Sequence, residues 1–482
     1  MCASDSSDQC LLNNVQPSDP IAFFNATCKQ GNVPSHYIEV RSPDQVSAAF
    51  DFARRYGIQL SIKNSGHDFL GRNSGKGTVG LWVRRLGGIS RNEKFVPEGC
   101  TGVEPRDTIT TAAGVNFDEV YQFAEEQNVT FIGGYAATVG ATGGWVQGGG
   151  HSVLSTVYGL GIDRVLQYKV VTADGVLRTA NTCTNSDLFW ALRGGGGGTF
   201  GVVMAATHAV EPKMRLSVAS IKYTQTALNV NGWLEILVNN SLRWANEGWG
   251  GHYLANNLIG VTPLLSLANA AHSMRTASDF AIANNGTVIL EELPSWYDFY
   301  TKYVIPNTAP VGNSRILASR MIPASIFSTE AGRAKLMDLL QSILKIGFSP
   351  YIPNTTPFLY PWIPGSTSAT TAWRGAVWHL SIGATWEWNS TVTQRRSVNS
   401  LLNTLMGEME ELVPGGGAYL NEANPWTKNW KWEWWGENYE RLVEIKEKYD
   451  PDGLLSCWRC VGFNESGADM RFPCFNRLTP SV

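Results

Sequence analysis

The chain has 482 residues, a formal net charge of -3 and a charged fraction of only 16%. Its length allows two or three domains, and its hydrophobic fraction of 43% is enough for a large core. It carries no basic stripe and no apolar run near the roughly 20 residues of a membrane helix, so neither nucleic acid nor a membrane is an expected partner.

The first predicted elements are a helix and a strand within residues 42–62. Ser42 is a candidate N-cap, and Pro43 suits the first helical position. Apolar residues then recur at helical spacing until Gly57, which ends the helix, and the alternating "IQLSI" follows as a strand. The same order of helix, strand and glycines recurs in residues 116–134.

A hairpin and a third helix complete this half of the chain. The segment "KVVTADGVLRTA" (169–180) is predicted to turn at Asp174 and Gly175. The segment "NSDLFWALR" (185–193) is predicted to be a helix that runs into five consecutive glycines. Residues 35–210 are therefore expected to form a mixed α+β unit whose strands end in glycine loops.

The amino-acid composition changes between about residues 213 and 420. Glycine becomes rarer and long apolar stretches appear, so a second domain with a sheet is expected. Within it, "AVWHLSIGATWEW" alternates as a strand and places His379 and Ser381 on one face. Near the end, "ENYERLVEIKEKYDPDGLL" (437–455) is predicted to be an amphipathic helix with a Pro/Gly stop.

Cysteines and glycosylation sequons point to secretion. The eight cysteines are expected to be mostly or wholly paired, with Cys10–Cys28 as the first expected disulfide. The "CWRC" pair, Cys457 and Cys460, is typical of a redox motif or half of a zinc site, but no second CxxC exists and a disulfide is favoured. No leader peptide is visible at Met1, so the mature form is expected. Sequons start at Asn25, Asn128, Asn239, Asn285, Asn354, Asn389 and Asn464.

Three glycine-rich turns lie at 64–77, 133–150 and 194–201. The last contains a literal G-x-G-x-x-G, but a helix precedes it and a strand-like segment follows, which is the reverse of a Rossmann site. No phosphate-binding P-loop, HExxH zinc helix or GxSxG elbow occurs. Backbone N–H groups in such turns can hold a pyrophosphate, and the alternative is that the glycines only permit tight packing. We favour a dinucleotide site.

One histidine, His67, lies in the turn "SIKNSGHDFLGRNSG" between a glycine and an aspartate. A core histidine would have apolar neighbours, and a metal-binding histidine would usually have a second ligand nearby. His67 has neither in the sequence, so no metal site is predicted here.

Four segments together resemble a known family. They are "SIKNSGHDFLGRNSG", "GGYAATVGATGGWVQGGGHSVLSTVYGLGIDRVLQYKVVTADG", "DLFWALRGGGGGTFGVV" and "WWGENYERLVEIKEKYDPDGLL". In their sequences and their order, these segments resemble the berberine bridge enzyme-like oxidases of the vanillyl-alcohol oxidase flavoprotein superfamily. Among these, they are most similar to the fungal secreted, isoamyl alcohol oxidase-like branch. The resemblance covers the N-terminal half and about the last sixty residues.

The resemblance implies an α+β fold with a two-part FAD-binding domain. The N-terminal part would span residues 1–212, and a C-terminal part, 425–482, would return to it. An inserted α+β substrate domain, 213–424, would cover the flavin with its sheet.

The resemblance also implies the cofactor and its ligands. His67 would be linked covalently to the 8α-methyl carbon of FAD. Many relatives have a second bond from a cysteine, but Ala136 stands at that position, so a single link is expected. The residues expected to bind FAD are Lys63, Asn64, Ser65, Gly66, His67, Asp68, Thr138, Val139, Gly140, Gly143, Gly144, Gly149, His151, Asn421 and Asn438.

The catalytic base is not assigned by the sequence. Some relatives have a catalytic glutamate on a substrate-domain strand, but residues 349–373 contain no Asp, Glu, His or Lys. Tyr419 is the first catalytic candidate by analogy, and it could act as a base if its pKa were depressed. His379 and His151 are further candidates, and each could equally be a structural, hydrogen-bonded residue.

The predicted function is a secreted, FAD-linked oxidase that acts as a monomer. A base would take the proton of a substrate hydroxyl, hydride would pass to the flavin, and oxygen would yield hydrogen peroxide. The expected partners are a small-molecule substrate, oxygen and N-linked glycans. Two alternatives remain: a non-redox cyclisation or isomerisation in the flavin pocket, and a non-catalytic protein that stacks sugars on Trp426, Trp430, Trp432, Trp434 and Trp435.

Overall fold

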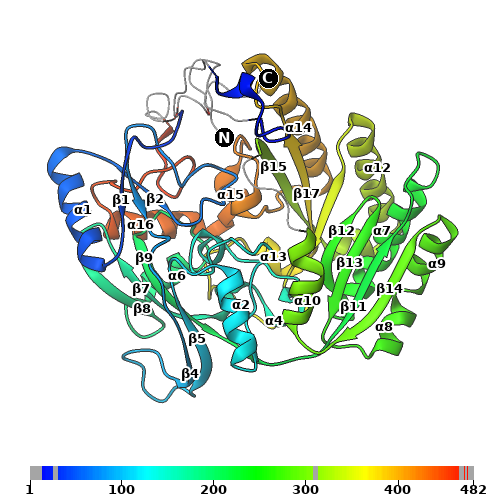
Figure 1. Ribbon diagram of the computed structural model, residues 1–482, viewed down its shortest axis with the longest axis horizontal. Helices are drawn as coiled ribbons and strands as arrows, with labels where there is room; N and C mark the ends of the chain where they lie inside the picture. The colour runs from blue at the N-terminus through cyan, green and yellow to red at the C-terminus, as the bar shows by residue number, and fades with distance from the viewer. Residues whose placement is uncertain (1–12, 25–30, 308–312, 466–471, 473–474, 476–482) are drawn as a thin grey trace.

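The structure, a computed structural model, describes residues 13–24, 31–307, 313–465, 472 and 475 (Figure 1). It mixes helices with four sheets. The fold class is α+β, as predicted from the sequence. No helix of these residues is long and apolar enough to cross a membrane.

A small parallel sheet lies at one end of the molecule. It has the order β1 (His36–Glu39), β3 (Val79–Trp82), β2 (Leu60–Lys63). Helix α1 (Pro43–Tyr56) packs one apolar face into the core and ends at Gly57, which has a φ of 63°. This left-handed conformation is available to glycine at little steric cost, so the predicted helix end is confirmed.

A five-stranded antiparallel sheet follows. Its order is β4 (Ile89–Phe95), β5 (Arg106–Ala112), β9 (Val202–Ala209), β7 (Val165–Val171), β8 (Leu177–Asn181). The predicted hairpin is therefore confirmed as β7–β8.

Two predicted helices flank these strands. Helix α2 (Phe117–Glu126) begins with a capping box, in which Asn116 and Glu119 exchange hydrogen bonds. Helix α6 (Ser186–Leu192) is buried along most of its length.

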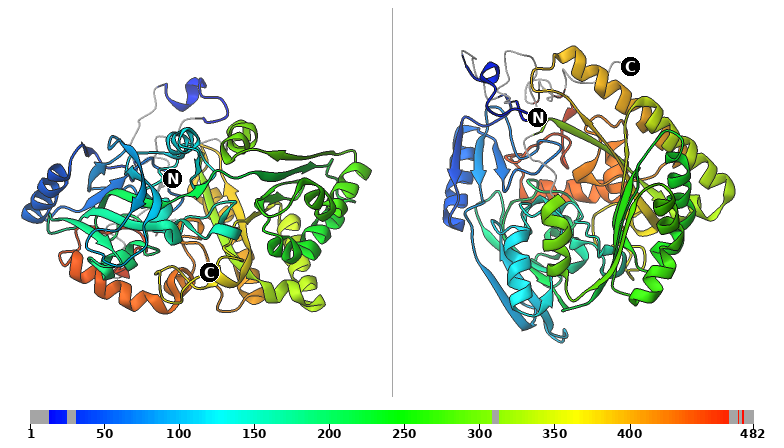
Figure 2. Two further views of the ribbon diagram at one scale, coloured as in Figure 1. Left: turned by 90° about the horizontal axis from the view of Figure 1, so that it is seen from below. Right: turned by 45° about the vertical axis from the view of Figure 1, so that its right-hand side comes forward.

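A seven-stranded sheet forms the other half of the molecule. Its order is β14 (Thr287–Leu293), β11 (Leu216–Lys222), β13 (Asn257–Thr262), β12 (Gly250–Leu254), β16 (Pro350–Asn354), β17 (Ala376–Thr385), β15 (Arg315–Pro323). The helices over one face include α7 (Val230–Asn246), α8 (Leu267–Ser273), α9 (Arg275–Ala283), α12 (Glu330–Ile346) and α14 (Val392–Leu412) (Figure 2, right). The opposite face is turned toward the first half.

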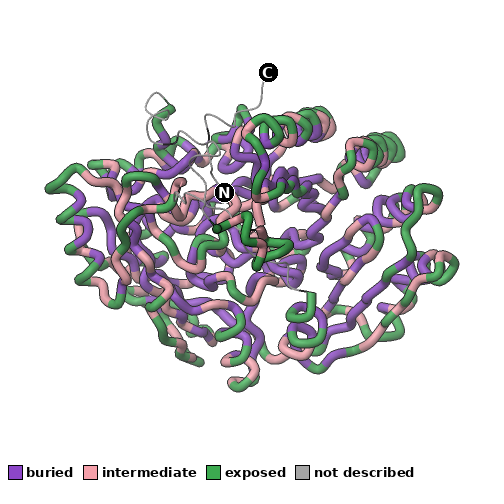
Figure 3. The backbone as a smooth tube through the Cα atoms, turned by 45° about the horizontal axis from the view of Figure 1, so that its top comes forward, coloured by how far each residue is buried: buried purple, intermediate pink, exposed green. Residues whose placement is uncertain are grey.

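The alternation of side chains along β11 shows what each face contacts. Ala219 and Ile221 pack into the core beneath the helices, whereas Leu216 and Val218 pack with residues of α2. Strand β11 is thus buried on both sides, and Figure 3 shows buried, purple tube inside both halves of the molecule.

The chain then returns to the first half through α15 (Trp430–Trp435) and α16 (Tyr439–Tyr449), drawn in orange in Figure 1. The Leu60 backbone N–H, in β2, donates to the Leu454 carbonyl at 2.9 Å. Lys446 of α16 donates to the Thr199 carbonyl at 2.7 Å. The last described segment therefore completes the edge of the small sheet. The boundaries at 213 and 425 stay a prediction.

The tryptophans of α15 are packing residues. Trp430, Trp434 and Trp435 are 1–2% exposed and join the same core cluster as α6. Trp432 is 42% exposed and Trp426 is partly buried. A sugar-stacking platform across the five residues is therefore not formed, which contradicts that alternative.

Two disulfides join described cysteines, Cys100–Cys183 and Cys457–Cys460. The second confirms the preference for a disulfide over a metal site in "CWRC". The predicted Cys10–Cys28 pair lies outside the described residues.

Candidate active site

A cavity of about 1970 Å³ lies between the glycine-rich turns and the seven-stranded sheet. It is about twice the upper limit of the ~300–1000 Å³ that a drug-sized ligand usually occupies. Its walls come from the turn after β2, the segment 134–151, the sheet and the segment around Tyr419. The size and the long glycine-lined part fit a dinucleotide together with a second, smaller molecule.

The turn after β2 is held by one carboxylate. Asp68 accepts hydrogen bonds from the backbone N–H groups of Leu70 and Asn73, each at 3.1 Å. It also forms an ion pair with Arg72 at 3.1 Å, and both side chains are less than 10% exposed. The rigid turn leaves His67 exposed in the cavity wall. Asp68 is therefore a support of the turn as well as part of the cavity wall.

His67 makes one side-chain contact across the cavity wall. Its Nε2 atom lies 2.7 Å from the hydroxyl of Thr138. Burial lowers the pKa of His67, which favours the neutral imidazole. A neutral ring in an open cavity wall can act as a nucleophile.

The part of the cavity wall around Gly140, Gly143 and Gly144 is formed by backbone atoms. A Cβ added at Gly140 or Gly143 would lie 2.7 or 2.8 Å from the Asn64 side chain, so only glycine fits there. A Cβ at Gly144 would meet nothing within 4 Å, because this residue faces the cavity. The buried Oδ1 of Asn64 has no hydrogen-bond partner in the described structure. This orphan acceptor and the exposed backbone fit a bound dinucleotide.

Most predicted cofactor residues line the cavity, but two do not. The amide of Asn438 donates to the carbonyls of Ser368 and Ala369 at 3.3 and 3.2 Å and lies outside the cavity wall. Gly149 also lies outside it, and a Cβ there would meet the Tyr419 ring at 3.1 Å. Both residues support the wall from behind, and direct contact with the cofactor stays a prediction for them. The predicted residues that do line it are Lys63, Asn64, Ser65, Gly66, His67, Asp68, Thr138, Val139, Gly140, Gly143, Gly144, His151 and Asn421.

Tyr419 and Asn421 reach the same cavity from the far end of the chain. Asn421 donates to the Tyr419 hydroxyl at 2.7 Å and to the Gly144 carbonyl at 2.9 Å. Burial raises the pKa of Tyr419. The condition for Tyr419 to act as a base, a depressed pKa, is therefore not met, and the phenol stays protonated.

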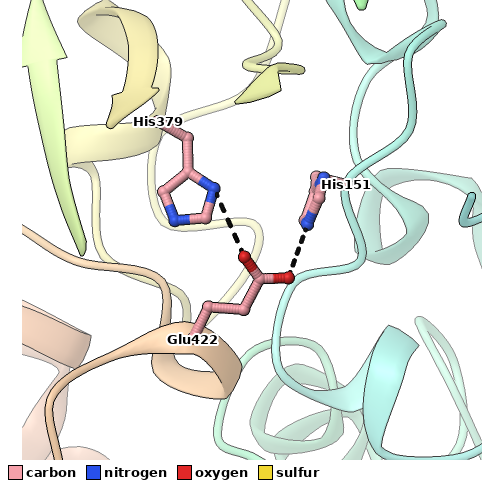
Figure 4. A group of neighbouring side chains, drawn as sticks. All are labelled: His151, His379 and Glu422. Carbon is pink, nitrogen blue, oxygen red and sulfur yellow. Dashed lines mark hydrogen bonds and ion pairs between the residues drawn. The ribbon is translucent and has the colours of Figure 1, made fainter. Parts of the chain in front are cut away.

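Glu422 is the residue that sequence reasoning missed. It follows Asn421 directly and lines the cavity, and its carboxylate lies between two histidines (Figure 4). Oε1 lies 3.0 Å from His151 Nε2, and Oε2 lies 3.8 Å from His379 Nδ1. The signal available in the sequence was the carboxylate in "AYLNEANP" itself, next to the residues already singled out.

The two histidines differ in access. His379, on β17, is fully buried and absent from the cavity wall, and burial lowers its pKa to about 4. His151 follows the glycine run 148–150 and lines the cavity. Burial opposes ionisation of Glu422, but the charge and hydrogen bond of His151 outweigh it and lower the pKa of the carboxyl. Glu422 is therefore an anion at neutral pH.

Three further rings line the cavity beside this group. The Tyr351 hydroxyl lies 2.6 Å from His252 Nδ1, and the His252 ring meets the Tyr135 ring edge-on at 4.2 Å. Burial lowers the pKa of His252 to about 3, so this imidazole is neutral. The wall here can offer hydrogen bonds and ring contacts but little charge.

The fold and the cavity define a class, the FAD-dependent oxidoreductases of the vanillyl-alcohol oxidase type. Residues 34–181 match the model of an FAD binding domain, and residues 418–456 match the model described as berberine and berberine like. The chain belongs to the berberine bridge enzyme-like family of these flavoproteins.

Relatives of known name support this membership. FAD-linked oxidoreductase ffsJ of Aspergillus flavipes is 43% identical over 97% of this chain and 82% of its own. The bifunctional decalin synthase calF of Penicillium decumbens is 31% identical over 92% of this chain and 79% of its own.

Solved structures share the fold. The VAO-type flavoprotein MtVAO615 of Myceliophthora thermophila C1 superposes with a TM-score of 0.80 at 31% identity, over 90% of this chain and 81% of that one. The glucooligosaccharide oxidase of Acremonium strictum, whose FAD is 6-S-cysteinyl and 8α-N1-histidyl, superposes with a TM-score of 0.72 at 20% identity, over 89% of this chain and 92% of that one. The second likeness shows the fold alone.

Proposed function

We propose that this protein is a secreted oxidase that converts a substrate alcohol to a carbonyl compound, with FAD linked covalently to His67. The observation that carries the proposal is the position of His67 in the wall of the same cavity as Tyr419 and Glu422. A neutral imidazole at one end and a polar, carboxylate-bearing wall at the other fit a flavin held between the two.

FAD, when bound, accepts a hydride and passes its electrons to oxygen, which gives hydrogen peroxide. The chain supplies the surroundings. His67 would hold the cofactor, and the backbone around Gly144, which lines the cavity, would contact it. Tyr419 and His151 line the cavity and belong to the group that binds the substrate hydroxyl, and the buried His379 supports Glu422 from behind. Ala136 has no atom that can form a second link.

The sheet contributes both aliphatic and polar side chains to the wall of the cavity. The aliphatic ones are Leu254, Leu258, Ile259, Ile289 and Leu317, and the polar ones are Ser220, Lys222, His252, Asn257, Thr287, Arg315 and Tyr351. The buried tryptophans of α15 offer no sugar platform, so we favour an apolar alcohol or biosynthetic intermediate over a sugar as the substrate. Burying its apolar surface against the aliphatic residues would contribute to the binding free energy.

Secretion is supported by the disulfides and by the sequons. Two disulfides are present among the described residues. The asparagines of five sequons, Asn128, Asn239, Asn285, Asn389 and Asn464, are exposed, whereas Asn354 is fully buried and is excluded as a glycan site in the folded protein.

An anaerobic screen of apolar alcohols, sugars and phenols, followed by flavin absorption, tests this function. Bleaching by an apolar alcohol, with peroxide formed after oxygen is admitted, is the expected result. A second candidate is cyclisation of a biosynthetic intermediate, which the likeness to the decalin synthase calF favours. In that case the product would form at equal mass without bleaching, and the proposed oxidase would be contradicted.

A further inference from the structure

The hydrogen bond between His151 and Glu422 fixes the proton on one ring nitrogen. Glu422 Oε1 lies 3.0 Å from Nε2, and the anionic carboxylate can only accept. When the imidazole is in its neutral form, Nε2 must therefore carry the proton, and Nδ1 then carries the lone pair.

The side chain of His151 is accessible from the cavity. The residue lines the cavity, and its side chain is 12% exposed. The buried side-chain atoms without a partner among the described residues include Nδ1 of His379 but neither nitrogen of His151. The Tyr419 ring stands nearly perpendicular to the His151 ring, with centroids 5.2 Å apart, and limits its rotation.

His379 acts on the other oxygen of the carboxylate. Its Nδ1 lies 3.8 Å from Glu422 Oε2, and its side chain is fully buried. Ser381 Oγ, on the same strand face, lies 3.5 Å from Nε2 of the ring. His379 thus stands behind Glu422, away from the cavity, where it can orient the carboxylate but cannot touch a substrate.

We propose that His151 is the general base of the reaction and that Glu422 and His379 are positioning residues that hold its Nδ1 toward the substrate. This assignment rests on the proposed alcohol oxidation. The substrate O–H bond breaks and its proton passes to Nδ1, while the C–H bond breaks and its electron pair leaves with the hydride to FAD. The carbon–oxygen double bond forms, and the imidazolium later returns its proton to water. A buried carboxylate that fixes the tautomer of a catalytic imidazole is a known arrangement on unrelated folds.

The same three side chains could instead hold a metal ion, since their ligand atoms all lie within 4.8 Å of one another. Two imidazoles and a carboxylate are suitable ligands for a transition metal. The existing His151–Glu422 hydrogen bond and the position of His379 behind the carboxylate favour the base. Metal content of the purified holoenzyme decides between the two. Stoichiometric metal whose removal by a chelator abolishes flavin reduction would overturn the proposal.

The kinetic test uses the alcohol that bleaches the wild-type flavin fastest. His151→Gln and Glu422→Gln are expected to slow anaerobic flavin reduction by about 10²-fold or more, with little change in substrate dissociation constant. Glu422→Asp should restore part of the rate, and added imidazole should restore part of it in His151→Ala. The matched control is His272→Gln, an exposed histidine of α8, which should reduce at the wild-type rate. An unchanged rate in Glu422→Gln would overturn the proposal.

A second readout does not depend on turnover. Diethyl pyrocarbonate modifies accessible neutral imidazoles, and peptide mapping of the holoenzyme should find His151 and His272 modified and His379 unmodified. Glu422→Gln should slow modification of His151 relative to His272. If no alcohol bleaches the wild-type flavin, the proposed function fails while this test still decides whether His151 is a reactive, accessible imidazole supported by Glu422. Modification of His272 without His151 would overturn the assignment.

Discussion

The Arg72 guanidinium donates a hydrogen bond to Asn421 Oδ1 at 2.8 Å, across 349 positions of sequence. Arg72 is at the same time held by Asp68, which supports the turn of His67. The turn that carries the predicted flavin link and the segment that carries Tyr419 and Glu422 are therefore joined directly.

Asn421→Ala should weaken this junction. The substitution removes the acceptor of Arg72 and the donor to the Tyr419 hydroxyl and the Gly144 carbonyl. Loss of these partners from a partly buried group is expected to cost about 1–3 kcal/mol of unfolding free energy. Urea denaturation measures it, with the exposed Asn246→Ala of α7 as the control. Equal stability of the two variants would contradict the structural role.

His67 should carry the only covalent flavin bond. Acid precipitation of the wild type should leave a yellow pellet, and His67→Ala should release its FAD while His272→Ala retains it. Because Ala136 cannot form a thioether, mass spectrometry should find one flavinylated peptide, which contains His67. A flavin that bridges two peptides would disprove the single link, and FAD released completely from the wild type would disprove the bond itself.

Acid should destabilise the protein through its buried histidines, and His208 isolates the effect. Both ring nitrogens of His208 are buried without partners, and burial, with a smaller effect of Arg164, lowers its pKa to about 3. The unfolded chain, with a pKa of about 6.5, binds the proton first as pH falls, so unfolding free energy decreases below that value. The contribution lost is about 3 kcal/mol at pH ~4.

Melting temperatures between pH ~7 and ~4 test this sign. His208→Gln should flatten the acid slope, whereas the exposed His272→Gln should keep it. His252 and His379, with pKa values lowered to about 3 and 4, contribute slope of the same sign and should leave part of it in the variant. A slope identical to the wild type would refute the assignment.

The Cys100–Cys183 disulfide should be a major source of stability. It spans 83 residues, and closing a loop of that size stabilises by about 4.5 kcal/mol in the chain-entropy account. The double variant Cys100→Ser/Cys183→Ser should lose roughly this amount in denaturant titrations. Reducing agent should lower the wild-type midpoint toward that of the variant. Identical midpoints of wild type and variant without reductant would contradict the prediction.

Local features were predicted well because their causes are local. Helix α1 and its glycine end, helix α2 and the β7–β8 hairpin all follow from patterns of a few residues. His67 was found because its turn has an unusual amino-acid sequence, and it lies in the cavity wall.

What failed depends on contacts between distant segments. Glu422 contacts His151, which is 271 positions away in the sequence, and His379, which lies on strand β17 of the seven-stranded sheet. The periodicity of a sequence does not predict contacts between such distant segments. Asn438 was assigned to the cofactor by analogy, yet its amide is consumed by two backbone carbonyls. Most positions of α15 are aromatic, so its sequence does not show which face of the helix is buried.

The hydrogen bond from Leu60 to Leu454 has a consequence for biosynthesis. The strand that leads into the His67 turn leaves the ribosome about 400 residues before the segment that completes its edge. At ~5–20 residues per second, roughly 20–80 s separate the two. Glu422, Asn421 and Tyr419 also arrive late. The cavity therefore cannot exist until the segment from Tyr419 to Leu454 has been made, and cofactor loading must wait for that segment.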